Sequence, residues 1–168
     1  MSLRRPVISA RHKILPLAAL VRAVRAVQHQ GRKVVFTNGC FDLVHAGHVK
    51  ILERARAQGD LLVVAVNSDH SVRGLKGPGR PVMHEQDRAL LLAAFACVDF
   101  VVIFKEPTPQ RVIEKIKPDV LIKGSDWKAG QIVGAECVRA RGGKVIRIPL
   151  LQGHSTTNLL ERIRTAVR

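Results

Sequence analysis

An uninterrupted run of six apolar residues, from Leu61 to Val66, constrains the fold of this 168-residue chain more than any other feature. The run lacks the alternation of a strand with one solvated face. It therefore predicts a strand that is covered on both faces, as parallel strands are when helices pack on each side of a sheet. No apolar stretch approaches the roughly 20 residues that a membrane-spanning helix needs, so we expect no membrane span.

Strand and helix patterns alternate along the whole chain, and this alternation predicts the α/β class. We expect a single doubly wound, Rossmann-like domain with a five-stranded, mainly parallel sheet and right-handed crossovers. Residues 1–31 are expected to form an N-terminal extension with an amphipathic helix, and residues 32–168 the domain itself. The expected strands are 34–36, 61–66, 100–104, 120–122 and 144–148, and the expected helices 17–30, 47–58, 85–96, 110–116, 135–140 and 157–167.

The chain is strongly basic, because 28 Lys and Arg residues against 13 Asp and Glu residues give a formal net charge of +15. The basic residues are dispersed, and five Phe, one Trp and no Tyr provide little for stacking nucleic-acid bases. We therefore expect a small polyanionic substrate and no nucleic acid as the main partner. A basic nucleic-acid-binding module remains the non-enzymatic alternative.

The cysteines and the N-terminal residues bear on the compartment. Cys40, Cys97 and Cys137 are widely spaced and odd in number, so neither a disulfide framework nor a zinc knuckle fits them. Charged residues from Arg11 to Lys13 interrupt the first apolar stretch, and no signal-peptide core follows. We expect a cytoplasmic protein with reduced thiols.

Polar clusters follow four of the expected strands, at residues 37–48, 67–73, 123–126 and 152–157. The carboxyl ends of parallel strands meet at one edge of the sheet, and ligands bind there near the point where the strand order reverses. We therefore expect these clusters to build one ligand site.

The segment His45-Ala46-Gly47-His48 is the sharpest feature of the first cluster. At the start of a helix the two imidazoles project from one face, where exposed N–H groups already favour phosphate. Two other interpretations stay open: a chance pair of surface histidines, or a metal pair that includes Asp42. Because zinc sites usually bring three or four protein ligands and no further cluster supplies them, we favour phosphate binding and expect no metal site formed by the protein.

Several motifs in order carry a resemblance to a known family. The segment from Thr37 to His48, with its His-x-Gly-His, resembles the signature of a nucleotidyltransferase superfamily. Further matching motifs lie at residues 66–69, 71–81, 88, 97–99, 118–124 and 155–157. Together they resemble the D-glycero-β-D-manno-heptose 1-phosphate adenylyltransferase family over about residues 32 to 165, which makes residues 32–168 a nucleotidyltransferase domain.

The resemblance implies transfer of AMP from ATP to a heptose 1-phosphate, with release of pyrophosphate and with Mg²⁺ accompanying ATP. A sugar phosphate is already a nucleophile, so the enzyme has to align two polyanions and stabilise charge and needs no nucleophilic side chain. Cys40 accordingly receives no catalytic role. Many relatives fuse this domain to a sugar kinase, so we expect a separate kinase to supply the heptose 1-phosphate here. A homo-oligomer is compatible with the sequence.

The resemblance also assigns the site residues. The catalytic residues it implies are His45, His48 and Lys50. Those for nucleotide binding are Asn38, Gly39, Phe41, Asp42, His45, Gly47, His48, Arg88, Lys123, Gly124, Asp126, Ser155, Thr156 and Thr157. Those for the second substrate are Asn67, Asp69, Arg73, Lys76 and Arg80.

Three of these assignments have ordinary structural alternatives. Lys76 and Arg80 also suit a solvated basic loop, and Arg88 suits the solvated flank of an apolar helix. Residues 155–157 suit a helix N-cap, a role compatible with binding phosphate.

The main enzymatic alternative is a cytidylyltransferase acting on glycerol 3-phosphate or a similar polyol phosphate. Such enzymes carry Arg-Thr-x-Gly-Ile before Ser-Thr-Thr, whereas this chain has Leu150-Leu151-Gln152-Gly153-His154. The departure counts against the cytidylyl alternative.

Overall fold

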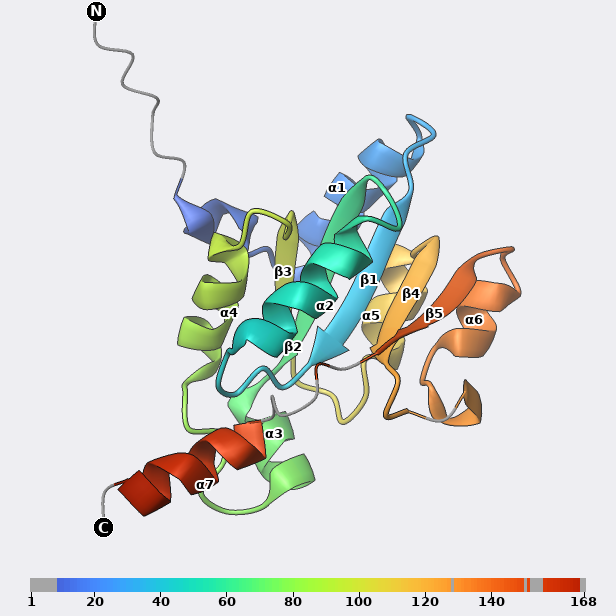
Figure 1. The fold of residues 1–168 in the computed structure, drawn as a ribbon. Coiled ribbons are helices and arrows are strands. Elements are labelled where there is room, and N and C mark those ends of the chain that lie inside the picture. Colours follow the sequence, from blue (N-terminus) through green and yellow to red (C-terminus); the bar gives the residue numbers. More distant parts are fainter. Residues whose placement is uncertain (1–8, 128, 150, 152–155, 167–168) are drawn as a thin grey trace, which may run out of the picture.

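The computed structural model describes residues 9–127, 129–149, 151 and 156–166. Its five strands form one sheet in the order β3-β2-β1-β4-β5, with every neighbouring pair parallel (Figure 1). The strands are β1 (Val34–Gly39), β2 (Leu61–Asn67), β3 (Phe100–Phe104), β4 (Val120–Gly124) and β5 (Lys144–Ile148). The predicted fold class is confirmed, and the sheet is entirely rather than mainly parallel.

The described helices connect these strands in the predicted order. They are α1 (Leu17–Gln28), α2 (Ala46–Arg56), α3 (Asp69–Lys76), α4 (Glu85–Ala94), α5 (Gln110–Ile116), α6 (Ala135–Arg139) and α7 (Thr156–Ala166), with short 3₁₀ turns η1 (Ala10–Lys13) and η2 (Ala129–Gln131).

One helix was not predicted, and several predicted boundaries were wrong, among them the end of β4, which runs on to Gly124 instead of ending at Ile122. The expected polar cluster 67–73 contains most of α3, which begins because the Ser68 side chain accepts a hydrogen bond from the Ser71 backbone N–H. β1 runs on to Gly39, where it still pairs with Val66 of β2. α4 ends at Ala94 because Phe95 already has an extended backbone.

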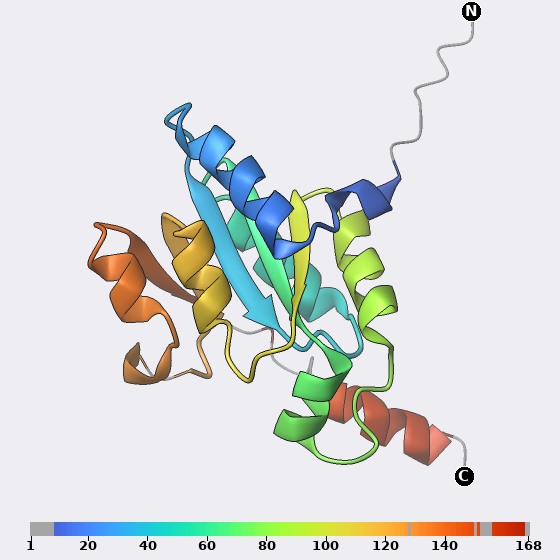
Figure 2. The ribbon, with the colours of Figure 1, turned by 180° about the vertical axis from the view of Figure 1, so that it is seen from behind.

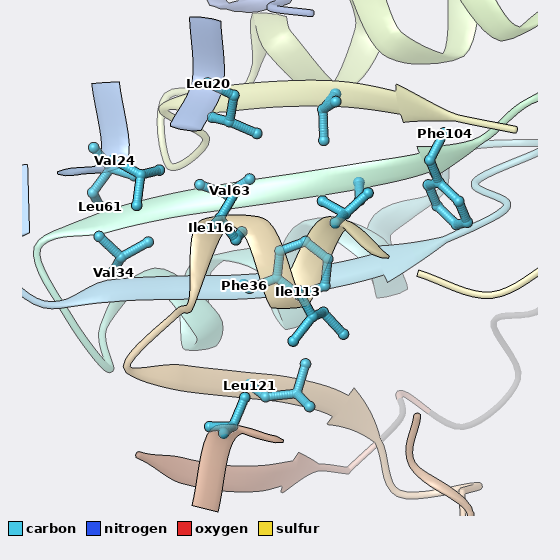
Figure 3. Packing of buried hydrophobic residues seen from close by; sticks show 14 of the residues in the cluster. Leu20, Val24, Val34, Phe36, Leu61, Val63, Phe104, Ile113, Ile116 and Leu121 are labelled. Carbon is cyan, nitrogen blue, oxygen red and sulfur yellow. The ribbon is translucent and has the colours of Figure 1, made fainter. Parts of the chain in front are cut away.

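Helices cover both faces of the sheet, as the unalternating run in β2 requires. Residues of α2 and α4 pack on one face, which is in front in Figure 1. Residues of α1, α5 and α6 pack on the other, which Figure 2 shows from behind. Figure 3 shows Leu20 of α1 and Ile113 of α5 near Val63 and Phe36 of the sheet. All seven residues of β2 are buried.

Carboxylates fix the amino ends of the central strands. Asp119 Oδ2 accepts a hydrogen bond of 2.8 Å from the Val34 backbone N–H, and Asp99 Oδ2 accepts one of 2.7 Å from Leu62. These two acidic residues belong to motifs that carry the family resemblance, but they lie at the end of the sheet opposite the expected ligand edge. In the described structure these two carboxylates bind backbone N–H groups at the amino ends of β1 and β2.

The chain reverses direction across the sheet between β1 and β4. From β1 it adds β2 and β3 on one side, and then crosses to add β4 and β5 on the other. In such sheets the crevice at the reversal point, outside the carboxyl ends of the strands, is the ligand site. Among the described helices, none is both long and apolar enough to cross a membrane.

Candidate functional site

A cavity of about 780 Å³ lies at the carboxyl ends of β1, β2 and β4. The predicted site residues that line it are Asn38, Gly39, Phe41, Asp42, His45, Gly47, His48, Asn67, Lys76, Arg80, Lys123, Asp126, Thr156 and Thr157. A smaller hollow of about 290 Å³ beside α6 contains none of the predicted residues. The fold therefore brings four separate polar clusters to one place.

Some predicted residues do not line this cavity. Lys50 on α2 and Arg73 on α3 are exposed, and neither is among the lining residues. Asp69, Arg88 and Gly124 are also absent from the lining. Ser155 lies outside the described residues.

The two histidines of the signature are stacked at the start of α2. His45 is the N-cap residue, and the centroids of the His45 and His48 rings are 3.9 Å apart. The backbone N–H of His45 donates a hydrogen bond of 3.3 Å to Nδ1 of His48. Because Nδ1 accepts this bond, the neutral His48 ring carries its proton on Nε2. His48 is thus held as a hydrogen-bond donor.

His48 is neutral at pH 7. Burial, together with the nearby His45, lowers the pKa of His48 from 6.5 to about 4. The positive end of the α2 dipole lies at the same turn and favours an anion there. The site therefore offers an anion a neutral imidazole donor and a helix N-terminus.

Asp42 connects the signature turn to the loop before α4. Its carboxylate is 2% exposed and accepts hydrogen bonds from Arg80 Nε and from the backbone N–H groups of Val82 and Met83. These contacts hold the loop that carries Arg80 against the turn after β1. In the described structure Asp42 and Arg80 thus form an ion pair with each other, and both line the cavity.

Arg88 connects three segments from a fully buried position. Its guanidinium donates to the carbonyl oxygens of Met83 and Cys40 and, over 2.7 Å, to Asp69 Oδ1. Although burial by itself raises the pKa of Asp69, the hydrogen bonds from Arg88 and His84 outweigh it and lower that pKa. With an exposure of 0%, Arg88 is no solvated helix flank, so that alternative was wrong.

Lys123 is the last residue but one of β4, at the reversal point, and is 8% exposed. Burial lowers the pKa of Lys123 to about 8, while the charge of Asp126 acts in the opposite direction. An arriving anion would favour the protonated form of this amine. A bound phosphate would therefore raise the pKa of Lys123 and stabilise its positive charge.

The sequence analysis missed several lining residues. Trp127, Leu75 and residues 107–109 line the same cavity. Trp127 directly follows the predicted cluster 123–126, so its position after a buried strand was the available signal. Leu75 lies within the motif 71–81, next to Lys76, which was the available signal for it. Residues 107–109 have no comparable signal, because their role in the cavity depends on how the segment after β3 is placed.

Comparisons with known proteins agree with this geometry. A model of the Cytidylyltransferase-like family matches residues 36–159. The protein called "Bifunctional protein HldE" is 55% identical in Geotalea uraniireducens (strain Rf4) over 153 residues, 91% of this chain and 31% of the relative. The protein of that name in Azotobacter vinelandii is 53% identical over 151 residues, 90% of this chain and 32% of the relative. The chain thus spans about a third of these relatives.

Two solved structures share the fold. The lipopolysaccharide core biosynthesis protein from Thermoplasma volcanium GSS1 has a TM-score of 0.61 and 26% identity, covering 74% of this chain and 100% of that protein. A pantoate-beta-alanine ligase from Francisella tularensis, complexed with beta-gamma ATP and beta-alanine, also has a TM-score of 0.61. It is only 13% identical, over 92% of this chain and 78% of the ligase, so it supports the fold alone.

The lowered pKa of His48 predicts a pH-dependent stability. In the unfolded chain His48 takes up its proton near pH 6.5, but in the folded protein only near pH 4. The unfolded state therefore binds more protons between these values, and the free energy of unfolding falls as the pH drops from 6.5 to 4. In urea titrations, His48→Asn should reduce this fall, whereas His70→Asn on the exposed side of α3 should not. An unchanged pH dependence in His48→Asn would contradict the buried, neutral imidazole.

Proposed function

The chain belongs to the cytidylyltransferase-like family and is a nucleotidyltransferase, and from this premise we propose that it transfers AMP from ATP to D-glycero-β-D-manno-heptose 1-phosphate. The products are ADP-heptose and pyrophosphate. The ordered motifs that resemble heptose 1-phosphate adenylyltransferases support this choice of substrates. The relatives called "Bifunctional protein HldE" and the lipopolysaccharide core biosynthesis protein of similar fold support it further.

One observation carries the proposal: a single cavity at the reversal point collects the groups that a reaction between two phosphates needs. The stacked His45 and His48 line it after β1, and Lys76 and Lys123 line it from α3 and β4. Two polyanions repel each other in water, so most of the catalytic work is to hold them in line and to neutralise charge. Cationic and N–H groups around a shared cavity are suited to this work.

The reaction is a displacement at the α-phosphorus of ATP. A phosphate oxygen of the sugar attacks, a new P–O bond forms, and the bond to the bridging oxygen of pyrophosphate breaks with its electron pair on the leaving group. His45 and the Nε2–H of His48 stabilise the charge on the phosphates. The attacking oxygen is already anionic, so the chain does not have to remove a proton.

Further lining groups suit the nucleotide. Oδ1 of Asn38 is buried and has no hydrogen-bond partner among the described residues, so it can accept from a ribose hydroxyl or an amino group. The Thr156 hydroxyl donates a hydrogen bond of 3.4 Å to the Leu43 carbonyl, which keeps the start of α7 beside the signature turn. Thr157 lies in the first turn of that helix, where N–H groups favour phosphate.

We propose that a magnesium ion comes with ATP and is held by its phosphates, since the described residues offer no cluster of ligands of their own. They contain no group of three His, Cys, Asp or Glu side chains placed to hold a metal, and the Asp42 carboxylate is engaged by Arg80 and two backbone N–H groups. Mg²⁺ is usually bound largely by substrate phosphates and water, and here it would neutralise the leaving pyrophosphate. In this proposal a sugar kinase activity supplies the heptose 1-phosphate.

Removal of either signature imidazole should slow turnover. We expect His45→Ala and His48→Ala each to lower kcat by about 10² to 10⁴, since each removes stabilisation of charge in the transition state. Continuous pyrophosphate release at pH 8 measures the rate, and His70→Ala is the matched control. Wild-type turnover in both signature variants would remove these histidines from the mechanism.

The choice of substrates is tested with four pairs, ATP or CTP with heptose 1-phosphate or glycerol 3-phosphate, at equal subsaturating concentrations. A base with the wrong hydrogen-bonding edge leaves buried groups unpaired, so ATP should exceed CTP by about tenfold or more in kcat/KM with the heptose phosphate. Glycerol 3-phosphate should be poor with either nucleotide. If CTP with glycerol 3-phosphate is the best pair, the cytidylyl alternative is correct. If no pair reacts and nucleic acid blocks ATP binding, the non-enzymatic alternative, a nucleic-acid-binding module, is correct.

A further inference from the structure

Trp127 is the only tryptophan of the chain, and nothing in the proposed chemistry uses it. Its side chain lines the cavity and is 44% exposed, although a large aromatic ring usually gains stability from burial. It belongs to neither of the two hydrophobic clusters that pack on the sheet. An exposed indole at the wall of a ligand cavity is available to a ligand.

The backbone around Trp127 is anchored. Its N–H donates a hydrogen bond of 3.2 Å to the Gly124 carbonyl, which closes a turn at the end of β4. The Ser125 N–H bonds to the carbonyl of Ile148 at the end of β5, and Arg147 donates to the Trp127 carbonyl. The turn is thus joined to two strands of the sheet, so the backbone of Trp127 is held at the wall of the cavity before any ligand arrives.

Two charged neighbours indicate what the ligand carries. Nζ of Lys123 lies 5.1 Å from the centroid of the Trp127 ring. Asp126, which directly precedes Trp127 in the sequence, lines the same cavity. A phosphate held by Lys123 would therefore lie close to the indole. The same segment offers a carboxylate that can accept hydrogen bonds from hydroxyl groups.

This arrangement suits a ligand whose phosphate is esterified to a carbon of the ring that covers the indole. In a sugar 1-phosphate the apolar C–H face of the ring can cover an indole while the phosphate reaches the neighbouring cation. In ATP the ribose stands between adenine and the phosphates, so an adenine stacked on the indole would hold the phosphates farther from Lys123 than a sugar 1-phosphate would. Glycerol 3-phosphate has no ring, and an acceptor with an ammonium group would be repelled by Lys123.

We propose that Trp127 is the platform for the sugar ring of the acceptor, with Lys123 binding its phosphate and Asp126 accepting hydrogen bonds from its hydroxyl groups. For Lys123 and Asp126 this differs from the nucleotide-binding role that the family resemblance implies. This inference rests on the proposed function, because it takes a sugar 1-phosphate as the acceptor. It makes Trp127 a specificity-determining residue of the cavity that binds the substrate and leaves the displacement step to the signature histidines.

Kinetics distinguish the acceptor platform from an adenine platform. Trp127→Ala should raise the KM for heptose 1-phosphate by about tenfold while the KM for ATP changes by less than about twofold, and Trp127→Phe should restore most of the loss. Leu91→Ala, at an exposed apolar residue of α4 outside the cavity, should change neither KM. A rise confined to the KM for ATP, or no change in either KM, would overturn the proposal.

Fluorescence tests the same contact without turnover. Because Trp127 is the only tryptophan, a sugar ring that covers it should shift the protein's emission to shorter wavelength, saturably, in the presence of a non-hydrolysable ATP analogue. Heptose 1-phosphate and mannose 1-phosphate are the probes, and inorganic phosphate is the control that reaches Lys123 without covering the ring. Equal responses to all three, or none to the sugars, would overturn the platform.

The two measurements separate the inference from the proposed function. A wild-type enzyme that binds the sugar phosphates with a blue shift but releases no pyrophosphate from ATP and heptose 1-phosphate would contradict the proposed reaction and support the platform. An enzyme that turns over normally but shows no effect of Trp127→Ala would contradict the platform alone.

Discussion

The site depends on one constraint, the parallel pairing of β1 with β2 on one side and β4 on the other. Thr37 of β1 lies beside Val64 of β2 and Ile122 of β4, and its hydroxyl donates to the Ile122 carbonyl. Because the crossovers leave β1 and β4 in opposite directions, their carboxyl ends open onto a crevice that no connecting helix fills. The histidine turn follows β1 into that crevice, and Lys123 lies near the end of β4 beside it, so the pairing places the two parts of the site.

Sequence patterns predicted most of this framework because the patterns and the framework have the same physical cause. The run from Leu61 to Val66 is apolar because helices cover both sides of β2, and the polar residues after the strands mark the edge that stays open. Patterns alone could not assign Asp42 and Arg88, since an ion pair within the protein and a contact with a ligand need the same residue types. In the described structure Asp42 holds the loop that carries Arg80, and Arg88 joins three segments, so both residues make contacts within the chain. Trp127 escaped prediction because its exposure depends on the anchored turn.

The cavity offers two polyanions both charged and neutral hydrogen-bond donors. His48 is neutral near pH 7 because its pKa is about 4, and the pKa of Lys123 is about 8. At pH 7 Lys123 is therefore mostly protonated while His48 is a neutral Nε2–H donor, so a bound phosphate would meet one charged and one neutral donor. Burial that is costly in the empty protein thus becomes useful in the complex, where the same low-dielectric surroundings strengthen each interaction with phosphate.

The central claim is that the chain positions two phosphates for one direct displacement and contributes no nucleophile of its own. The stereochemical course at the α-phosphorus tests it most directly, with a single diastereomer of adenosine 5′-O-(1-thiotriphosphate) and heptose 1-phosphate as substrates. One in-line displacement inverts the configuration at phosphorus, so the account predicts a thio-substituted ADP-heptose of inverted configuration. Retention would mean two successive displacements through a covalent enzyme intermediate, and it would contradict the account.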